Sequence, residues 1–286
     1  FNMKIAVLSG KGGTGKTTVS TNLASVFKDA ILIDADVEEP NASIFLKPVV
    51  TETEKVYVEY PVVDSNRCML CGKCGDLCKF NAIIPAKNTV LVFKESCHSC
   101  GGCQLVCPND AISYEKREIG EIRKGKTTAN SYMEYGLLNV GELSGVKIIQ
   151  KLKENTKKSN LVIIDSPPGT SCSTVAAIED VDYAIIVTEP TPFGVSDMKM
   201  VVEMLREMNI PFGVFVNKAD LGDNEVYVYC KEEKISILGN IPFSLEIAEL
   251  YSKGLIFSKY IPEYKNVFMN LIVEIKEQVE GGKNGY

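Results

Sequence analysis

Eight of the ten cysteines in this 286-residue chain fall between residues 68 and 107. They form two runs with the same spacing, in which successive cysteines are separated by two, two and three residues. The likeness extends past the cysteines, because Cys78-Lys-Phe-Asn-Ala-Ile83 aligns with Cys107-Pro-Asn-Asp-Ala-Ile112. The segment is therefore an internal duplication with an offset of 29 residues. A segment this short and this rich in cysteine is organised by whatever its thiols bind.

Three partners for these thiols have to be weighed: iron–sulfur clusters, zinc and disulfide bonds. Disulfides are typical of secreted chains, and we expect no secretory signal here, with Met3 as the natural first residue. Zinc usually takes its four ligands as two pairs, whereas each run places three cysteines in close succession. Iron–sulfur ligation is therefore favoured, and zinc is the main alternative.

The spacing resembles that of bacterial ferredoxins with two [4Fe–4S] clusters. In that family the fourth cysteine of each run binds the cluster of the other run, so the resemblance implies two mixed ligand sets. The first set is Cys68, Cys71, Cys74 and Cys107, and the second is Cys97, Cys100, Cys103 and Cys78. One departure is Lys79, which stands where the second copy has Pro108. Proline restricts the backbone, so the turn after Cys78 is expected to differ from its counterpart.

A second motif lies near the start of the chain. Residues 3–9 form a short apolar run, which leads directly into the pattern G-x4-G-K-T of a phosphate-binding loop. In such loops backbone N–H groups surround the phosphates, the lysine bridges the β- and γ-phosphates, and the threonine binds Mg²⁺. The predicted nucleotide-binding residues are Gly10, Lys11, Gly12, Gly13, Thr14, Gly15, Lys16, Thr17 and Thr18.

Two further apolar runs end in acidic residues. The run 30–33 is followed by Asp34 and Asp36, and the run 161–164 is followed by Asp165 and then Ser-Pro-Pro-Gly. Carboxylates at the ends of buried strands need a cation or a hydrogen-bond donor. The acidic residues therefore predict a Mg²⁺ site beside the phosphates.

With Lys11, the loop reads Gly-Lys-Gly-Gly-Thr-Gly-Lys-Thr-Thr. This form resembles the deviant phosphate-binding loop of the MinD, ParA, Mrp and nitrogenase iron-protein ATPases. The resemblance implies a homodimer that encloses two nucleotides, with Lys11 reaching into the partner's site as a catalytic residue beside Lys16. By analogy with arginine fingers, such a lysine contributes ~10³-fold or more to hydrolysis.

The same resemblance assigns roles to the acidic residues. It implies that Asp34 supports the Mg²⁺ held by Thr17, that Asp36 orients the attacking water, and that Asp165 contacts a water of Mg²⁺. Asn217 corresponds to the residue that reads adenine in the family. Asp220, three residues later, also gives the segment a likeness to the guanine-reading Asn-Lys-x-Asp of small GTPases. ATP is favoured over GTP, because the loop form and the paired acids belong to the ATP-using family.

The rest of the chain alternates short apolar runs with amphipathic segments, which is typical of an α/β protein with a mostly parallel sheet flanked by helices. Strands are expected at 183–188, 212–216 and 235–241, and helices at 142–154, 195–208, 244–253 and 263–280. We expect an ATPase domain from residues 1–56 and 116–286, with a small α+β ferredoxin domain inserted at residues 57–115. The chain as a whole thus resembles MinD-superfamily ATPases that contain an inserted ferredoxin domain.

Charge and hydropathy narrow the possible functions. The net charge of −6 and the scattered lysines and arginines argue against nucleic-acid binding. No apolar run reaches the length of a membrane span, so we expect a cytoplasmic protein. The favoured function is an ATP-dependent dimer that controls electron transfer from two [4Fe–4S] clusters to a redox partner. The main alternative is an Mrp-like carrier ATPase that delivers clusters to an accepting protein, and a ParA-like positioning role is the third.

Four features lie outside these motifs. Cys172 stands seven residues after Asp165, the offset of a cluster-binding cysteine in the nitrogenase iron protein, whereas Cys230 is expected to be a buried apolar residue. His98, between two cysteines of the second run, is expected to be partly exposed. Residues 132–145 are expected to form either a glycine-rich turn that leads into the helix at 142–154, where related proteins build part of the dimer and switch surface, or an ordinary junction between a loop and that helix. The apolar stripe of the C-terminal helix, which is expected to pack in the core, is Val267, Phe268, Leu271, Ile272 and Ile275.

Overall fold

The computed structural model describes residues 3–129, 131–154 and 161–283. Within these residues one sheet of nine strands has the order β11-β10-β9-β1-β8-β2-β7-β6-β3. The first seven strands of this order pair in parallel. They are β11 (Ile237–Ile241), β10 (Phe212–Asn217), β9 (Tyr183–Thr188), β1 (Met3–Leu8), β8 (Leu161–Asp165), β2 (Ile31–Asp34) and β7 (Tyr132–Leu138). The predicted α/β fold with a mostly parallel sheet is confirmed.

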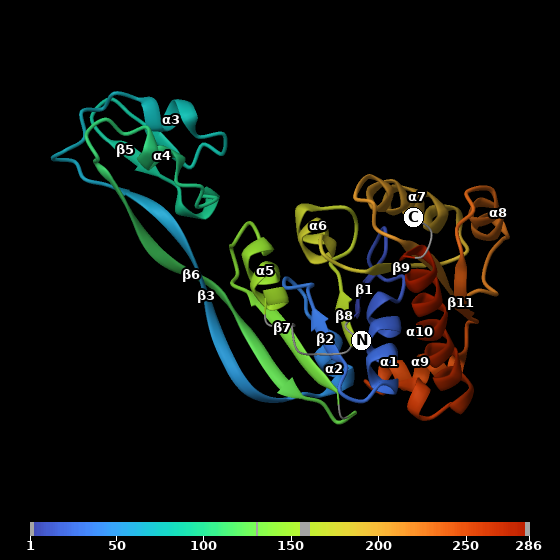
Figure 1. Ribbon diagram of the computed structural model, residues 1–286. Coiled ribbons are helices and arrows are strands. Elements are labelled where there is room, and N and C mark those ends of the chain that lie inside the picture. Colours follow the sequence, from blue (N-terminus) through green and yellow to red (C-terminus); the bar gives the residue numbers. More distant parts are fainter. Residues whose placement is uncertain (1–2, 130, 155–160, 284–286) are drawn as a thin grey trace.

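Helices cover both faces of the parallel strands (Figure 1). One face packs against α1 (Lys16–Val26), α2 (Ala42–Leu46), α9 (Leu245–Ser252), the short 3₁₀ helix η2 (Phe257–Lys259) and α10 (Pro262–Lys283). The other face packs against α5 (Val146–Glu154), α6 (Cys172–Ile178), α7 (Pro192–Glu207) and α8 (Glu225–Glu232). Strands buried on both faces need continuous apolar runs, which is why β1, β8 and β9 could be found in the sequence. No helix in the described part of the chain is long and apolar enough to cross a membrane.

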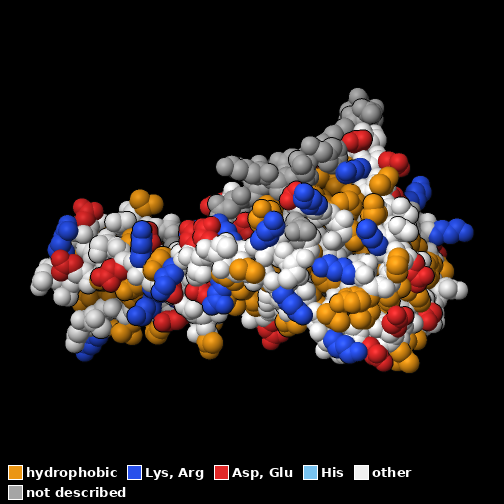
Figure 2. All heavy atoms as spheres, turned by 90° about the horizontal axis from the view of Figure 1, so that it is seen from below, with side chains coloured by type: hydrophobic (Ala, Val, Ile, Leu, Met, Phe, Trp, Pro, Cys, Tyr) orange, Lys and Arg blue, Asp and Glu red, His pale blue; other side chains and the backbone are white. Residues whose placement is uncertain are grey.

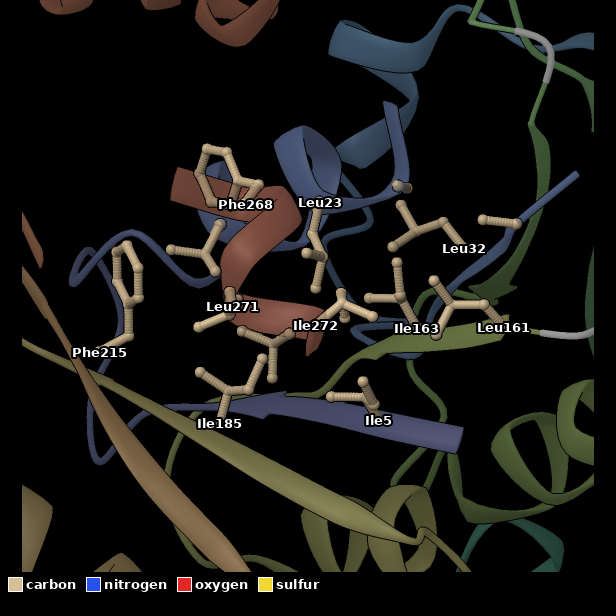
Figure 3. Close-up of a cluster of buried hydrophobic side chains, with 14 of the residues drawn as sticks. Ile5, Leu23, Leu32, Leu161, Ile163, Ile185, Phe215, Phe268, Leu271 and Ile272 are labelled. Carbon is tan, nitrogen blue, oxygen red and sulfur yellow. The ribbon is translucent and has the colours of Figure 1, made fainter. Parts of the chain in front are cut away.

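The C-terminal helix α10 packs into the core, as its apolar stripe predicts. Phe268, Leu271 and Ile272 are at most 2% exposed. Figure 3 shows them beside Leu23 of α1 and Ile185 of β9. The helix therefore closes one face of the sheet and is not available as a membrane-binding tail.

The last two strands of the sheet, β3 (Val49–Val63) and β6 (Ile112–Lys126), form a long antiparallel ribbon that we call the arm. Pairing of β6 with β7 is confined to Gly120–Lys126, so residues 112–119 continue beyond the sheet. At the usual rise per residue of a strand, this free part extends roughly 25 Å. Lysine, arginine and acidic side chains line the arm between the two parts of the molecule (Figure 2).

The arm carries the cysteine module, residues 64–111, at its far end (Figure 1). The module contains α3 (Lys73–Leu77), β4 (Ile83–Pro85), β5 (Val90–Val92), the 3₁₀ helix η1 (Lys94–Ser96) and α4 (Gly102–Leu105). The predicted domain limits at 56/57 and 115/116 fall inside the continuous strands β3 and β6. The arm therefore joins the module to the sheet through two continuous strands, whose pairing shifts register at Val50/Glu52 and at Val56/Tyr57.

The internal duplication also appears in the backbone of the module. The pair Val63↔Ile112 at the end of the arm corresponds, after a shift of 29 residues, to the pair Val92↔Ile83 of the β4–β5 hairpin. Left-handed φ angles recur with the same shift at three pairs of positions: Leu70 and Ser99, Gly72 and Gly101, and Asn81 and Asp110. Since non-glycine residues rarely adopt such angles, their repetition shows that both halves fold in the same way.

Residues 139–145 form the turn that leads into α5, but the prediction that the turn begins at residue 132 is wrong, because residues 132–138 form β7 and α5 begins only at Val146. The reason lies at Gly136, where an added Cβ would come within 2.5 Å of Ile148 and 2.7 Å of Val37. Glycine is needed there for close packing of α5 on the strand. It does not mark a turn.

Shortening Phe268 tests the role of α10. The Phe268→Ala variant leaves a cavity among fully buried side chains, and we expect a loss of about 3–5 kcal/mol in the free energy of unfolding. Chemical denaturation followed by circular dichroism measures this loss. The neighbouring Met269 is 42% exposed, so Met269→Ala is a matched control that should change stability by less than about 0.5 kcal/mol. Equal effects of the two variants would contradict the packing described.

Candidate functional site

The phosphate-binding loop connects β1 to α1 at the carboxyl edge of the parallel strands. Gly13 and Gly15 have φ angles of +81° and +97°, which side chains disfavour. At Gly15 an added Cβ would also lie 2.4 Å from the amide nitrogen of Asn217. Lys16, the first residue of α1, is only 7% exposed. The loop therefore keeps a buried cation at the start of a helix, where anions are bound in many proteins.

Asp34 and Asp165 end two adjacent strands and lie directly opposite each other in the register of β2 and β8. Both residues are 1% exposed. Burial, followed by the charge of Asp165, raises the pKa of Asp34 despite hydrogen bonds from the N–H groups of Ala42 and Asp36. Burial also raises the pKa of Asp165 to about 6, although Lys16 opposes the shift. Two carboxylates held this close and this deep need a positive charge between them.

The donor set fits Mg²⁺. Among the residues that the structure describes, none gives a hydrogen bond to the buried Oδ1 atom of Asp165, and the buried hydroxyl of Thr14 also lacks a partner. Unsatisfied buried oxygens are costly, so these atoms are suited to a ligand that contributes a cation and phosphates. Thr17, Asp34 and Asp165 would hold Mg²⁺, which prefers oxygen ligands and keeps several waters.

Seven of the ten predicted nucleotide-binding residues line one cavity of about 420 Å³, and Gly10, Lys11 and Thr14 do not. Part of the cavity wall is formed by Gly12, Gly13, Lys16 and Thr17, beside Asp36. The pKa of Asp36 is raised, because the effect of burial exceeds the opposing effect of the Lys16 charge. Beyond them lies a side that the sequence analysis missed. It is formed by Ile241, Pro242, Phe243, Ile247, Ala248 and Tyr251, and the predicted Asn217 lines the same cavity. An apolar wall with a few polar groups is typical of a site for a nucleobase.

Asn217 and Asp220 have different roles in this geometry. The amide of Asn217 donates a hydrogen bond of 2.9 Å to the Thr14 carbonyl and borders the cavity. The Oδ1 atom of Asp220 accepts from the backbone N–H of Phe243. Asp220 thus holds the loop after β11 in place, and it is not among the residues that line the cavity.

Lys11 points away from the cavity of its own chain. Its ammonium group lies 4.0 Å from a carboxylate oxygen of Asp197 and 6.0 Å from the centre of the Phe193 ring. The Lys11 side chain is 40% exposed, and Phe193 is 77% exposed. Lys16 lines the nucleotide cavity, whereas Lys11 is not among the lining residues.

The eight cysteines of the module surround two separate hollows. One is lined by Cys68, Cys71, Cys74 and Cys107, and the other by Cys78, Cys97, Cys100 and Cys103. These are the two mixed sets expected from the ferredoxin resemblance. The thiol groups receive hydrogen bonds from N–H groups, including Ser99 to Cys97 at 3.4 Å and Ala111 to Cys107 at 3.3 Å. Such bonds are typical of iron–sulfur ligands.

Within the described residues, no group of three or more histidine, cysteine or acidic side chains is arranged to hold a single metal ion. Four cysteines line each hollow, and four is also the number of ligands that a structural zinc ion takes. A [4Fe–4S] cluster binds each cysteine through a different iron, so its ligands stand farther apart. The chemistry of four thiols around each hollow fits such a cluster.

The remaining single residues have distinct environments. Cys172 is exposed at the first position of α6. Cys230 is 1% exposed, and burial raises the pKa of its thiol to about 11, which agrees with its prediction as an apolar core residue. His98 is exposed and stacks on Phe80, with 3.7 Å between ring centres.

Comparison with known proteins gives consistent results. A family model described as the CobQ/CobB/MinD/ParA nucleotide binding domain matches residues 5–257. A protein of Methanocaldococcus jannaschii named as uncharacterized is 33% identical over 98% of both chains. Another protein of that organism, named iron-sulfur cluster carrier protein, is 27% identical over 98% of this chain and 86% of its own length. The septum site-determining protein MinD of Pyrococcus horikoshii, solved with Mg-ADP, has a TM-score of 0.60 at 20% identity over 97% of both chains.

Replacing Lys16 tests the phosphate site. We expect Lys16→Ala to weaken ATP binding and to lower hydrolysis by about 100-fold or more, because the only buried lysine of the loop is lost. Binding of a fluorescent ATP analogue and phosphate release measure the two effects. Lys28→Ala, an exposed lysine shortly after the same helix, is the matched control. Full activity of the Lys16 variant would contradict the assignment.

The raised pKa of Asp165 predicts how stability depends on pH. Between about pH 4 and pH 6 the folded state binds more protons than the unfolded state, so the free energy of unfolding falls as pH rises through this window. Above it, the buried charge destabilises the nucleotide-free protein. Asp165→Asn should therefore stabilise the Mg²⁺-free protein at pH 7.5 and stabilise it much less at pH 5. Thermal unfolding at both values checks this, and a variant less stable at pH 7.5 would refute it.

Proposed function

This chain belongs to the CobQ/CobB/MinD/ParA family of nucleotide-binding domains, and from that premise we propose that it is a Mg²⁺-dependent ATPase that carries two [4Fe–4S] clusters. The observation that carries this proposal is the pairing of two four-cysteine hollows with a nucleotide cavity in one chain. The arm, whose strands β3 and β6 belong to the nine-stranded sheet, connects the two sites.

In the nucleotide site, Lys16 and the loop N–H groups bind the β- and γ-phosphates. Asp36 borders the cavity near Lys16 and orients the attacking water. Asn217 and Phe243 contact the adenine from the opposite end. When bound, Mg²⁺ neutralises the charge that develops on the phosphates during hydrolysis.

A homodimer completes this site. The exposed Lys11 and Phe193 lie at the carboxyl edge of the sheet, which is also the edge of the nucleotide cavity. Two chains that meet through this edge exchange their Lys11 side chains, and each lysine then stabilises the transferred phosphate of its partner. The outward direction of Lys11 supports this arrangement.

Nucleotide state is connected to the arm through α6 and α5. The segment 166–169 follows Asp165, and the Gly169 N–H bonds to the Ser9 carbonyl at the start of the phosphate-binding loop. The next helix, α6, is joined to α5 by Lys153, which donates to the Ala176 carbonyl at 2.7 Å. On the other side of α5, Lys151 pairs with Glu54 of the arm at 2.6 Å. A shift of the segment after Asp165 is therefore transmitted to the arm.

Of the two roles expected from the sequence, the comparisons favour the cluster carrier. Several relatives aligned over nearly the whole chain are named iron-sulfur cluster carrier protein. In this role the clusters are cargo, and ATP hydrolysis drives their release to an accepting protein. The exposure of Cys71 and Cys100, one in each set, leaves each cluster open to attack by an acceptor's thiols.

Electron transfer is the second candidate, and one observation favours it. Each hollow has four cysteines drawn from both runs, so each cluster ties the two halves of the module together. A cluster held in this way is difficult to release without unfolding the module. The clusters then act as resident redox groups, and nucleotide state controls their contact with a redox partner.

One experiment separates the two roles. The full chain is loaded with clusters without oxygen and mixed with an excess of an apo-ferredoxin, with or without Mg-ATP. The carrier role predicts that the acceptor gains clusters at least several-fold faster with Mg-ATP, and that Lys16→Ala removes this acceleration while Lys28→Ala does not. If the clusters stay on the chain and ATP hydrolysis changes when they are reduced, the electron-transfer role is favoured instead. Retained clusters with hydrolysis indifferent to reduction would contradict both.

A further inference from the structure

The duplication of the cysteine module allows its two cluster sites to be compared position by position. Gly75 follows the third cysteine of the first run, and Gln104 follows that of the second. The strand pairs next to the two runs match in register after a shift of 29 residues. The backbone angles repeat with the same shift. A difference between the two sites must therefore come from side chains at equivalent positions.

The difference that stands out is Tyr114. Its hydroxyl lies 3.0 Å from the sulfur of Cys103, which is buried and belongs to the second set. The equivalent of Tyr114 in the first half is Pro85, and the equivalent of Cys103 is Cys74. Pro85 lines the first hollow beside Cys74, just as Tyr114 lines the second beside Cys103. Proline has no hydroxyl to donate, so this contact exists on one side of the module alone.

The direction of the hydrogen bond follows from the chemistry of the ligand. A cysteine that binds iron is a thiolate and has no proton, so Tyr114 must be the donor. A hydrogen bond to a ligating sulfur withdraws negative charge from the cluster. It thereby stabilises the reduced form, and the reduction potential rises.

The second site is also the one nearer to the ATPase body. Ser99, in the loop of the second set, donates to the carbonyl of Glu59 in β3. Tyr114 pairs with Pro61 in the ladder of the arm. The first hollow is bordered instead by Val63, at the outer end of the same strand. The two sites thus follow each other along the arm, with the second set on the side of the sheet.

We propose that Tyr114 sets the order of the two reduction potentials, so that the site of Cys78, Cys97, Cys100 and Cys103 has the higher one. This inference rests on the proposed binding of two [4Fe–4S] clusters. Tyr114 makes the site near the body the electron acceptor within the module. One electron that leaves the outer cluster oxidises it and reduces the inner cluster by one unit, and no proton or further reactant is required. The first electron taken up by the module is therefore held by the cluster of the second set.

The test is an anaerobic redox titration of the loaded full chain with dithionite, followed by electron paramagnetic resonance. Cys71→Ala and Cys100→Ala each disable one site and assign the two signals. Tyr114→Phe retains the ring and loses the hydroxyl, so the midpoint potential of the second site should shift to a more negative value while that of the first stays unchanged. Tyr60→Phe is the matched control, because the Tyr60 hydroxyl bonds to Glu115 rather than to a sulfur. It should leave both potentials unchanged.

The unmodified protein provides a second measurement that needs no substitution at Tyr114. With one electron equivalent per chain, the reduced signal should be the one assigned to the second site. The inference would be overturned if the first electron reduced the cluster of the Cys68 set. It would also be overturned if the midpoint potential of the second site were the same in the Tyr114→Phe variant and in the unmodified protein. Iron analysis is made first on every sample, since a chain that binds no iron would overturn the proposed function itself and not only the role of Tyr114.

Discussion

The structure depends on two carboxylates that would repel each other without a cation. Asp34 and Asp165 are buried at adjacent strand ends, and burial together with their mutual charge raises the pKa of Asp34. A fold keeps such a pair only where a ligand compensates it. Each acid is followed by a segment that borders the cavity. Asp36 follows Asp34, and residues 166–169 follow Asp165. The ligand that compensates the charges therefore also fixes the position of the loops that lead to α2 and α6.

The arm extends the effect of this site to the cysteine module. A ribbon of two strands is marginally stable alone, but here its inner half is paired with β7 and packed against α5. Its outer half ends in the module, whose own strand pairs begin with Val63 and Ile112 of the arm. In the proposed function, a displacement of α5 acts on the inner half of the arm, and the two strands of the arm lead from there to the cysteine module.

Sequence reasoning succeeded where a short motif or a buried run determines the structure. The phosphate-binding loop, Asp34 and Asp165 could be placed because each stands at the end of a continuous apolar strand. The arm could not be found in the same way: most of β3 is exposed on both sides, so Thr51–Lys55 has no alternation of apolar and polar residues to mark a strand. Gly136 suggested a turn, since its role in packing against Ile148 is visible only in three dimensions. Phe243, in the loop after β11, and Tyr251, in α9, line the nucleotide cavity through tertiary packing, which no local pattern records.

The central claim is that one chain combines an ATPase site with two separate four-cysteine clusters. It is tested most directly by iron and acid-labile sulfide analysis with Mössbauer spectroscopy, on protein loaded without oxygen and freed of unbound iron. The account predicts about eight iron and eight sulfide ions per chain, all in [4Fe–4S] clusters, as expected for two clusters with four cysteine ligands each. One or two zinc ions per chain, or about two iron ions per chain from a single cluster shared between two subunits, would contradict it.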